Sequence, residues 1–318
     1  MSTKFVFDDL TKIPTILATN RAKRTDQTGA VGSKDAKPKK KDEHVDFFAK
    51  GNEHLTPEAV YQDSEDWNVR VFPNKYPLLA DHEIIVHSPD GQKDIEDLPQ
   101  EQNVRIIRAM LNRTDYFAQQ DKEVFIFNNR GGKAGASLLH PHSQITALKG
   151  FPGILETEKE YALHYYNEHT TCFWCDMLKR EIADKSRVVY ESAHYVLIVP
   201  IASRWSYELM LLPKRHNPNF GYMNEMEIND LAFVLKAALT AYNRLFERPD
   251  RNFWIHTQRY EPYHWHMGFI PHIKVFGGLE LGAGIWVSDK ASPEDAAKQL
   301  GEQISEICDK EIKTSIGE

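Results

Sequence analysis

Hydrophobic and polar residues in the first half of the chain follow the periods of two strands, a helix and a third strand. Residues 67–79 and 82–89 are rich in β-branched and aromatic residues and predict two strands. Residues 98–120 place apolar side chains three and four positions apart, which predicts a long helix. Residues 123–129 alternate again, and they predict a third strand that leads into a glycine-rich stretch.

The second half of the chain follows the same order. Residues 194–204 and 207–216 predict two strands, 225–247 predict a long amphipathic helix, and 252–258 predict a third strand. In both halves, two histidines separated by one residue follow the third strand. This correspondence predicts an internal repeat, in which one supersecondary unit occurs twice.

The spacing within the halves supports the repeat. Pro73 lies 67 positions before His140, and Pro200 lies 64 positions before His264. The glycine- and proline-containing residues 149–154 predict the junction. We therefore expect an α+β fold of two tandem domains, each an antiparallel sheet with a long helix. The expected boundaries are residues 1–150 and 151–318.

Composition narrows the classes of function. Of the 318 residues, 41% are hydrophobic, which is enough for real cores, and the net charge is −7. That charge leaves no basic excess to neutralise the phosphates of a nucleic acid. Three cysteines are too few for a disulfide framework and fit a reducing compartment. The chain has neither the apolar run of a signal peptide nor a membrane-spanning stretch of about 18 apolar residues. We expect a cytoplasmic protein that binds neither nucleic acid nor membranes.

Three hydrogen-bonding side chains follow the glycine-rich stretch of the first half. His140, His142 and Gln144 alternate, so in an extended chain they share one face. The preceding residues 131–136 are glycine- and alanine-rich, and their backbone N–H groups can bind an anion. A neutral imidazole can attack phosphorus, while an amide, the Ser137 hydroxyl and loop N–H groups stabilise the phosphoryl oxygens. The pattern predicts His142 as a nucleophile; a histidine that serves packing alone is the alternative.

The sequence resembles the galactose-1-phosphate uridylyltransferase family, a branch of the histidine-triad superfamily. The stretches that carry the resemblance are NRAKR (20–24), GNEHLTPEAVY (51–61), WNVRVFPNKYPLL (67–79), AGASLLHPHSQ (134–144) and GGLELGAGIWVS (277–288). The resemblance covers nearly the whole chain. It implies two histidine-triad-type domains, a nucleotide carried covalently on His142, and a homodimer whose active site is shared between subunits.

The resemblance also implies roles for residues outside the histidine motif. Those expected to contact the nucleotide or its phosphates are Arg21, Arg24, Asn74, Asn129, Gly135, Ser137 and Gln144. Lys274 and Glu280 are expected to meet the sugar phosphate.

A second motif points to a metal. Cys172 and Cys175 have the spacing of a zinc-binding pair. The resemblance supplies His216 and His264 as two further ligands, and so implies one closed, structural Zn²⁺ site in the second domain. Two buried cysteines without a metal are the alternative. A redox pair is disfavoured, because no thioredoxin-like pattern surrounds the cysteines.

The first half lacks this ligand set. The corresponding positions are Asp46, Ala49, Gly91 and His140, and only the histidine is a usual zinc ligand. We therefore expect no zinc in the first domain. Aromatic residues of 5–10 and 45–50 are expected to take over the metal's structural role, and His140 to orient Pro141 and His142 through hydrogen bonds. In the second half Met267 and Gly268 follow His266, so this second histidine pair is expected not to act in catalysis.

These observations favour a nucleotidyltransferase that exchanges a nucleoside monophosphate between UDP-glucose and a hexose 1-phosphate, galactose 1-phosphate being the expected acceptor. Two alternatives stay open. Residues 277–300 resemble ADP-glucose phosphorylases at least as much, and those enzymes transfer adenylyl to phosphate. The third possibility is a zinc-stabilised nucleotide-binding module without turnover. No residue of the sequence decides between uracil and adenine.

Overall fold

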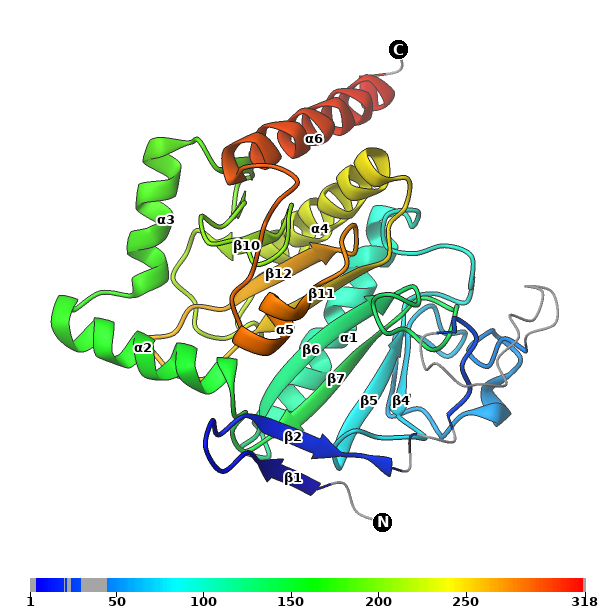
Figure 1. Cartoon of the computed structure of the whole chain (residues 1–318). Helices are drawn as coiled ribbons and strands as arrows, with labels where there is room; N and C mark the ends of the chain where they lie inside the picture. Colours follow the sequence, from blue (N-terminus) through cyan, green and yellow to red (C-terminus); the bar gives the residue numbers. More distant parts are fainter. Residues whose placement is uncertain (1–3, 20, 22–23, 30–44, 317–318) are drawn as a thin grey trace.

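The computed structural model describes residues 4–19, 21, 24–29 and 45–316, and its centre is a ten-stranded antiparallel sheet (Figure 1). The first repeat comprises β3 (Tyr61–Gln62), β4 (Arg70–Pro73), β5 (Asp81–Val86), α1 (Gln100–Ala118), β6 (Glu123–Arg130) and β7 (His142–Leu148). The second repeat comprises β8 (Val188–Glu191), β9 (Tyr195–Ile198), β10 (Leu209–Pro213), α4 (Glu225–Phe246), β11 (Arg251–His256) and β12 (His266–Pro271).

The sheet shows the repeat directly. Its strand order is β3-β4-β5-β7-β6-β11-β12-β10-β9-β8, so each half has the same order when read outward from the centre. The central strands β6 and β11 pair antiparallel, with Ile126 opposite Ile255. The prediction of antiparallel α+β units with one long helix each is confirmed. The two sheets join edge to edge into one, and the boundary at residue 150 stays a prediction.

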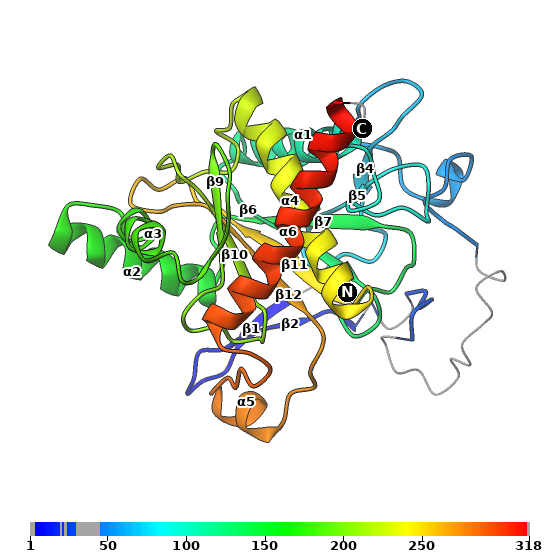
Figure 2. The same ribbon diagram turned by 90° about the horizontal axis from the view of Figure 1, so that it is seen from above.

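Helices α1 and α4 lie side by side on one face of the sheet, and α6 (Pro293–Ile316) packs on α4 and β8 (Figure 2). One hydrophobic cluster unites both repeats, with Ile107 on α1, Leu235 on α4 and the central pair Ile126 and Ile255. Burying each such side chain contributes about 1.5–3 kcal/mol to stability. The start of α4 is fixed by Asn224, whose side chain accepts hydrogen bonds from two backbone N–H groups of the first turn.

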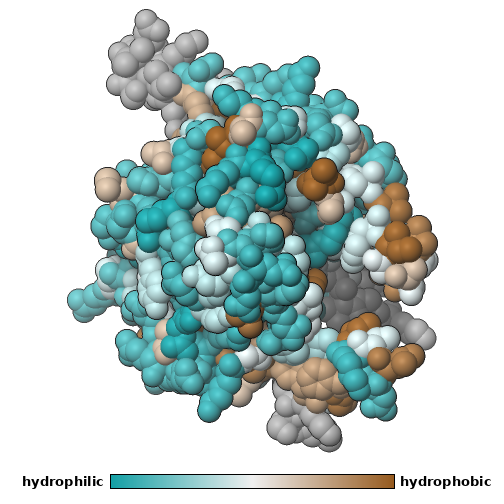
Figure 3. All heavy atoms as spheres, turned by 90° about the vertical axis from the view of Figure 1, so that its left-hand side faces the viewer, coloured by the Kyte–Doolittle hydropathy of each residue, from teal (hydrophilic) through white to brown (hydrophobic). Residues whose placement is uncertain are grey.

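Several elements lie outside the repeat. Besides α6, they are the hairpin β1 (Lys4–Phe7) and β2 (Pro14–Leu17), the 3₁₀ helix η3 (Glu53–Leu55), and the helices α2 (Ile154–His169), α3 (Phe173–Asp184) and α5 (Gly278–Ala283). The sequence patterns did not predict α2, because it buries only Leu155 and Ala162 and has no marked apolar stripe. Figure 3 views the side that carries α2 and α3 and shows a mostly hydrophilic surface. Among the described residues, no helix is both long and apolar enough to span a bilayer.

Candidate active site

Alternation along the first-repeat strands gives the sheet two different faces. Ile126 of β6 and Ile145 of β7 point to the helices and lie in the main core. Their neighbours Phe127 and Gln144 pair across the same two strands and line a pocket on the opposite face. The two-residue alternation that directs apolar side chains into the core therefore also directs polar side chains into the pocket.

The pocket brings together most of the residues singled out from the sequence. The predicted site residues that line it are Arg21, Arg24, Asn74, Asn129, Gly135, Ser137, His142 and Gln144. Aromatic side chains, among them Phe47 and Phe127, complete its wall. His140 is not part of this lining. β7 begins at His142, so His140 lies before the strand whose alternation relates His142 to Gln144.

The glycine-rich loop differs in part from the expectation. The backbone N–H groups of Gly135 and Ala136 donate to the carbonyls of Gly132 and Gly131, at 3.0 and 3.1 Å. These two N–H groups are used within the loop and are not available to an anion. Gly135 has a φ of +81°, a backbone conformation that favours glycine, and this explains the residue at that position.

His142 is held in one tautomer. Its Nδ1 atom lies 2.8 Å from the His140 carbonyl oxygen, which can only accept, so Nδ1 carries the proton and donates. Burial lowers the pKa of His142 to about 4, and the ring is therefore neutral near pH 7. The Nε2 atom then has a free lone pair beside the pocket. The Phe48 ring packs edge-on against the imidazole, with the centroids 5.3 Å apart.

Gln144 is oriented by a residue that sequence reasoning missed. The backbone N–H of Leu78 donates to Nδ1 of His82 at 2.9 Å, so the proton of the neutral ring lies on Nε2. Nε2 is 2.9 Å from Oε1 of Gln144 and donates to it. Burial lowers the pKa of His82 to about 4, which keeps this ring neutral. The contact joins two strands, and no sequence spacing indicated it.

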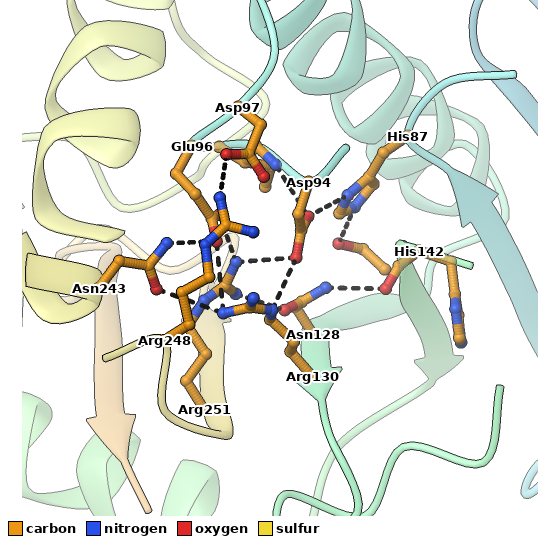
Figure 4. Close-up of polar contacts among 12 residues, drawn as sticks. His87, Asp94, Glu96, Asp97, Asn128, Arg130, His142, Asn243, Arg248 and Arg251 are labelled. Carbon is orange, nitrogen blue, oxygen red and sulfur yellow. Dashed lines mark hydrogen bonds and ion pairs between the residues drawn. The ribbon is translucent and has the colours of Figure 1, made fainter. Parts of the chain in front are cut away.

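A buried charge network lies behind the main chain of His142 (Figure 4). Arg251 of β11 places Nη2 at 2.8 Å from Asp94 and 2.6 Å from Glu96, and donates from Nη1 to Asn128 at 3.0 Å. Asn128 in turn donates to the His142 carbonyl at 2.7 Å. The second repeat thus supports the backbone of the candidate nucleophile.

The same network reaches the residue after His142. The Nδ1 atom of His87 lies 3.0 Å from Asp94, and its Nε2 atom lies 2.8 Å from the Ser143 hydroxyl. All three side chains are buried. Ser143 is not among the residues that line the pocket. This serine–histidine–aspartate arrangement therefore holds the strand and does not face the pocket.

The four predicted zinc ligands also come together. Ligand atoms of Cys172, Cys175, His216 and His264 lie within 4.8 Å of one another. His264 Nε2 is 3.0 Å from the Pro213 carbonyl, and His216 Nε2 is 3.0 Å from the Glu261 carbonyl. Both rings therefore donate from Nε2 and turn a free Nδ1 toward the sulfurs. This donor set fits a tetrahedral Zn²⁺ ion, and the backbone contacts have the orienting role that ligand histidines need.

The second histidine pair meets a carboxylate instead of an open pocket. His266 Nδ1 lies 3.1 Å from the His264 carbonyl, as in the first repeat, but His266 Nε2 lies 3.8 Å from Glu158. Glu158 also contacts His256 at 2.9 Å and Tyr263 at 2.6 Å. The ligand atoms of Glu158, His256 and His266 lie close enough together to hold a metal ion. Glu158 comes from α2, so no spacing in the sequence connected it with the histidines.

Lys274 and Glu280 lie apart from the pocket. Lys274 Nζ is 3.2 Å from Glu280 Oε1, and it donates to the Val287 carbonyl at 2.7 Å. Neither residue belongs to the pocket lining of the described chain. Lys274 therefore pairs with Glu280 of α5, and neither residue lies with His142 in the pocket.

Comparisons with known proteins agree across nearly the whole chain. Family models for the N-terminal and C-terminal domains of galactose-1-phosphate uridyl transferase match residues 80–152 and 158–283. An ADP-glucose phosphorylase from Arabidopsis thaliana is 27% identical, over 93% of this chain and 91% of its own. A galactose-1-phosphate uridylyltransferase from Thermotoga maritima is 29% identical, over 76% and 87%. The crystal structure of an ADP-glucose phosphorylase from Arabidopsis thaliana with bound ADP-glucose matches 95% of this chain and 99% of its own, with a TM-score of 0.74 and 25% identity.

Proposed function

The chain belongs to the galactose-1-phosphate uridylyltransferase family, and from this membership we propose that it is a nucleotidyltransferase acting through a covalent nucleotidyl-histidine. In the favoured reaction it exchanges a nucleoside monophosphate between UDP-glucose and a hexose 1-phosphate. The observation that carries the proposal is the geometry of His142, a buried neutral imidazole whose Nε2 lone pair borders the pocket.

In the first step, Nε2 of His142 attacks the α-phosphorus of the nucleotide sugar. A nitrogen–phosphorus bond forms, the bond from that phosphorus to the bridging oxygen breaks, and the sugar 1-phosphate leaves with the electron pair. The imidazole becomes cationic, and the His140 carbonyl that accepts from Nδ1 stabilises this charge. The Gln144 amide and the Ser137 hydroxyl border the pocket and can donate to the phosphoryl oxygens.

In the second step, a phosphate oxygen of the incoming hexose 1-phosphate attacks the same phosphorus. The nitrogen–phosphorus bond breaks, and His142 returns to its neutral form. The acceptor is already ionised near neutral pH and needs no general base, whereas water does. Gln144 cannot exchange protons as a third histidine could, so the intermediate should transfer to phosphates faster than it is hydrolysed.

A second candidate is the transfer of adenylyl from ADP-glucose to phosphate. It is supported by the Arabidopsis thaliana ADP-glucose phosphorylase, which aligns with 93% of this chain. Incubation with UDP-glucose and ADP-glucose separately, followed by intact mass measurement, tests both candidates. A uridylyl adduct supports the first and an adenylyl adduct the second. No adduct with either donor would favour a nucleotide-binding module without turnover.

We also propose that Cys172, Cys175, His216 and His264 bind one structural Zn²⁺. The proposal rests on the converging Nδ1 and sulfur atoms of the four residues. Four protein ligands would leave the metal no open position, so its role is to hold α3 to the second-repeat strands.

Finally, we propose a homodimer in which Lys274 and Glu280 reach the pocket of the second copy. Exposed apolar residues flank them, namely Val275, Leu279, Leu281 and Ile285, as expected of a surface that another chain covers. Mixing His142→Gly subunits with Lys274→Ala subunits tests this arrangement. A shared site predicts that the mixture regains activity that neither variant has alone, whereas sites contained in one chain predict no recovery.

A further inference from the structure

The first-repeat counterparts of the zinc ligands also come together, although they cannot form the same site. His140 Nδ1 lies 2.9 Å from each carboxylate oxygen of Asp46. A Cβ atom at Gly91 would lie 2.6 Å from Asp46 Oδ2 and 2.8 Å from His140 Nδ1. Gly91, which corresponds to His216, has no side chain. The space that a side chain would need there is occupied by Asp46 and His140.

The surroundings of His140 match those of His264 in the second repeat. His140 Nε2 lies 2.9 Å from the Ser88 carbonyl, as His264 Nε2 lies 3.0 Å from the Pro213 carbonyl. The backbone carbonyl of each histidine accepts from Nδ1 of the next histidine in its pair. The difference is confined to Nδ1, which faces a carboxylate in one repeat and two thiols in the other.

Both nitrogens of the His140 ring have an oxygen partner. While Asp46 is ionised, both contacts are satisfied only by a ring that donates from both nitrogens. His140 is 4% exposed, so a charge on its ring needs a partner, and Asp46 supplies one. Burial raises the pKa of Asp46, but the hydrogen bond and charge of His140 outweigh it and hold that pKa below its usual value.

We infer that the Asp46 carboxylate replaces a metal ion in the first repeat, and that the Asp46–His140 pair positions the carbonyl that fixes the tautomer of His142. The inference rests on the proposed role of His142. It adds a charged pair to the aromatic packing that the sequence predicts in place of the metal. Phe48 does contact both histidine rings, but the charge is balanced by Asp46. His142 is then oriented without a metal ion in the first repeat.

Asp46→Asn is the first test, because it keeps the shape of the side chain and removes its charge. We expect the rate of adduct formation to fall about 10- to 100-fold, the effect of losing one charge-assisted hydrogen bond. The KM for the nucleotide sugar should change little, because the pocket lining is intact. Asp66→Asn is the matched control, since Asp66 forms an exposed ion pair with Lys50. Equal rates in the two variants would overturn the inference.

Gly91→Ala tests the same pair without altering either of its members. The added Cβ atom would overlap both Asp46 and His140, so adduct formation should slow as it does in Asp46→Asn. Gly150→Ala is the control, because nothing lies within 4 Å of a Cβ atom there. If Gly91→Ala forms the adduct at the rate of the control, the contact between Asp46 and His140 does not position His142.

Rebuilding a metal site is the test that does not depend on activity. In the triple variant Asp46→Cys, Ala49→Cys, Gly91→His, the first repeat has the ligand types of the second. We expect the zinc content to rise by one ion per chain, and adduct formation to become more sensitive to a chelator than in the wild type. If the wild type forms no adduct, the proposed function fails while this zinc measurement still stands. A folded triple variant that binds no additional zinc would overturn the correspondence.

Discussion

The Nε2 atom of His82 lies 2.9 Å from the Oε1 atom of Gln144, and both side chains are buried. Because His82 must donate in this contact, the amide oxygen of Gln144 is committed to it. The amide NH₂ group is therefore turned toward the pocket, where it can donate to a phosphoryl group. A neutral histidine on β5 thus decides which end of the Gln144 amide faces the pocket.

We expect His82→Ala to slow transfer about 3- to 10-fold, because the orienting hydrogen bond contributes roughly 1 kcal/mol. Gln144→Ala should slow transfer more, and adding His82→Ala to it should change little further. Rates of the two single variants and the double variant measure this coupling. His164→Ala, on the exposed face of α2, is the control. Additive effects of the two changes would show that His82 does not act through Gln144.

The two histidine pairs should behave differently. His142→Gly should abolish both the covalent adduct and turnover, because it removes the attacking nitrogen. His266→Ala should keep most of both, since its Nε2 atom faces Glu158 and not the pocket. Peptide mapping of the adduct checks the assignment. A nucleotide attached to any histidine other than His142 would refute it.

Adduct formation should stay active at pH values at which an ordinary histidine is protonated. Burial lowers the pKa of His142 from 6.5 to about 4, so the acid limb should lie near pH 4. The unfolded chain binds this proton more readily. The stability that His142 contributes is therefore complete above about pH 6.5 and is lost as the pH falls through about 4. Single-turnover rates of adduct formation across this pH range test the prediction. A rate that falls near pH 6.5 would contradict a lowered pKa of His142.

Metal analysis should find one zinc ion per chain. Removing it with a chelator should lower the melting temperature, because the second repeat folds around the metal, and activity should fall only as structure is lost. Cys175→Ser should lose the zinc, whereas Cys308→Ser should keep it, because Cys308 lies outside the ligand cluster. Two zinc ions per chain in the wild type would mean that a second site also binds metal.

Arg251→Met should destabilise the fold by about 3–5 kcal/mol, because Asp94 and Glu96 lose their fully buried charge partner and keep only Arg130, at 3.8 and 3.4 Å. Arg248→Met is the matched control. Arg248 pairs with Asp97, and its side chain is 53% exposed, so its loss should cost less than about 1 kcal/mol. Denaturant unfolding of both variants measures the difference. Similar losses of stability would show that burial of the Arg251 network contributes little.

The sequence alone indicated the order of the repeated elements and several residues that line the pocket. Periods of two and of 3.6 residues appear in the sequence itself. They placed α1, α4, the strands β4, β5, β6, β9, β10 and β11, and the repeat, but not α6 or the strands β1, β2, β3 and β8. The same alternation put His142 and Gln144 on one face of β7, and the C-x-x-C spacing marked Cys172 and Cys175. These features follow from neighbours along the chain, so a linear pattern is enough to find them.

Tertiary structure decided the contacts between distant residues. Only the fold brings Asp46 to His140, His82 to Gln144 and Glu158 to the second histidine pair. It also joins the two sheets through β6 and β11, which places Arg251 behind the main chain of His142. Such contacts depend on strand register and on how loops cross the sheet, and these are set by the packing of the whole core. No local spacing carries that information, because the partners lie many residues apart and their side chains are of common types.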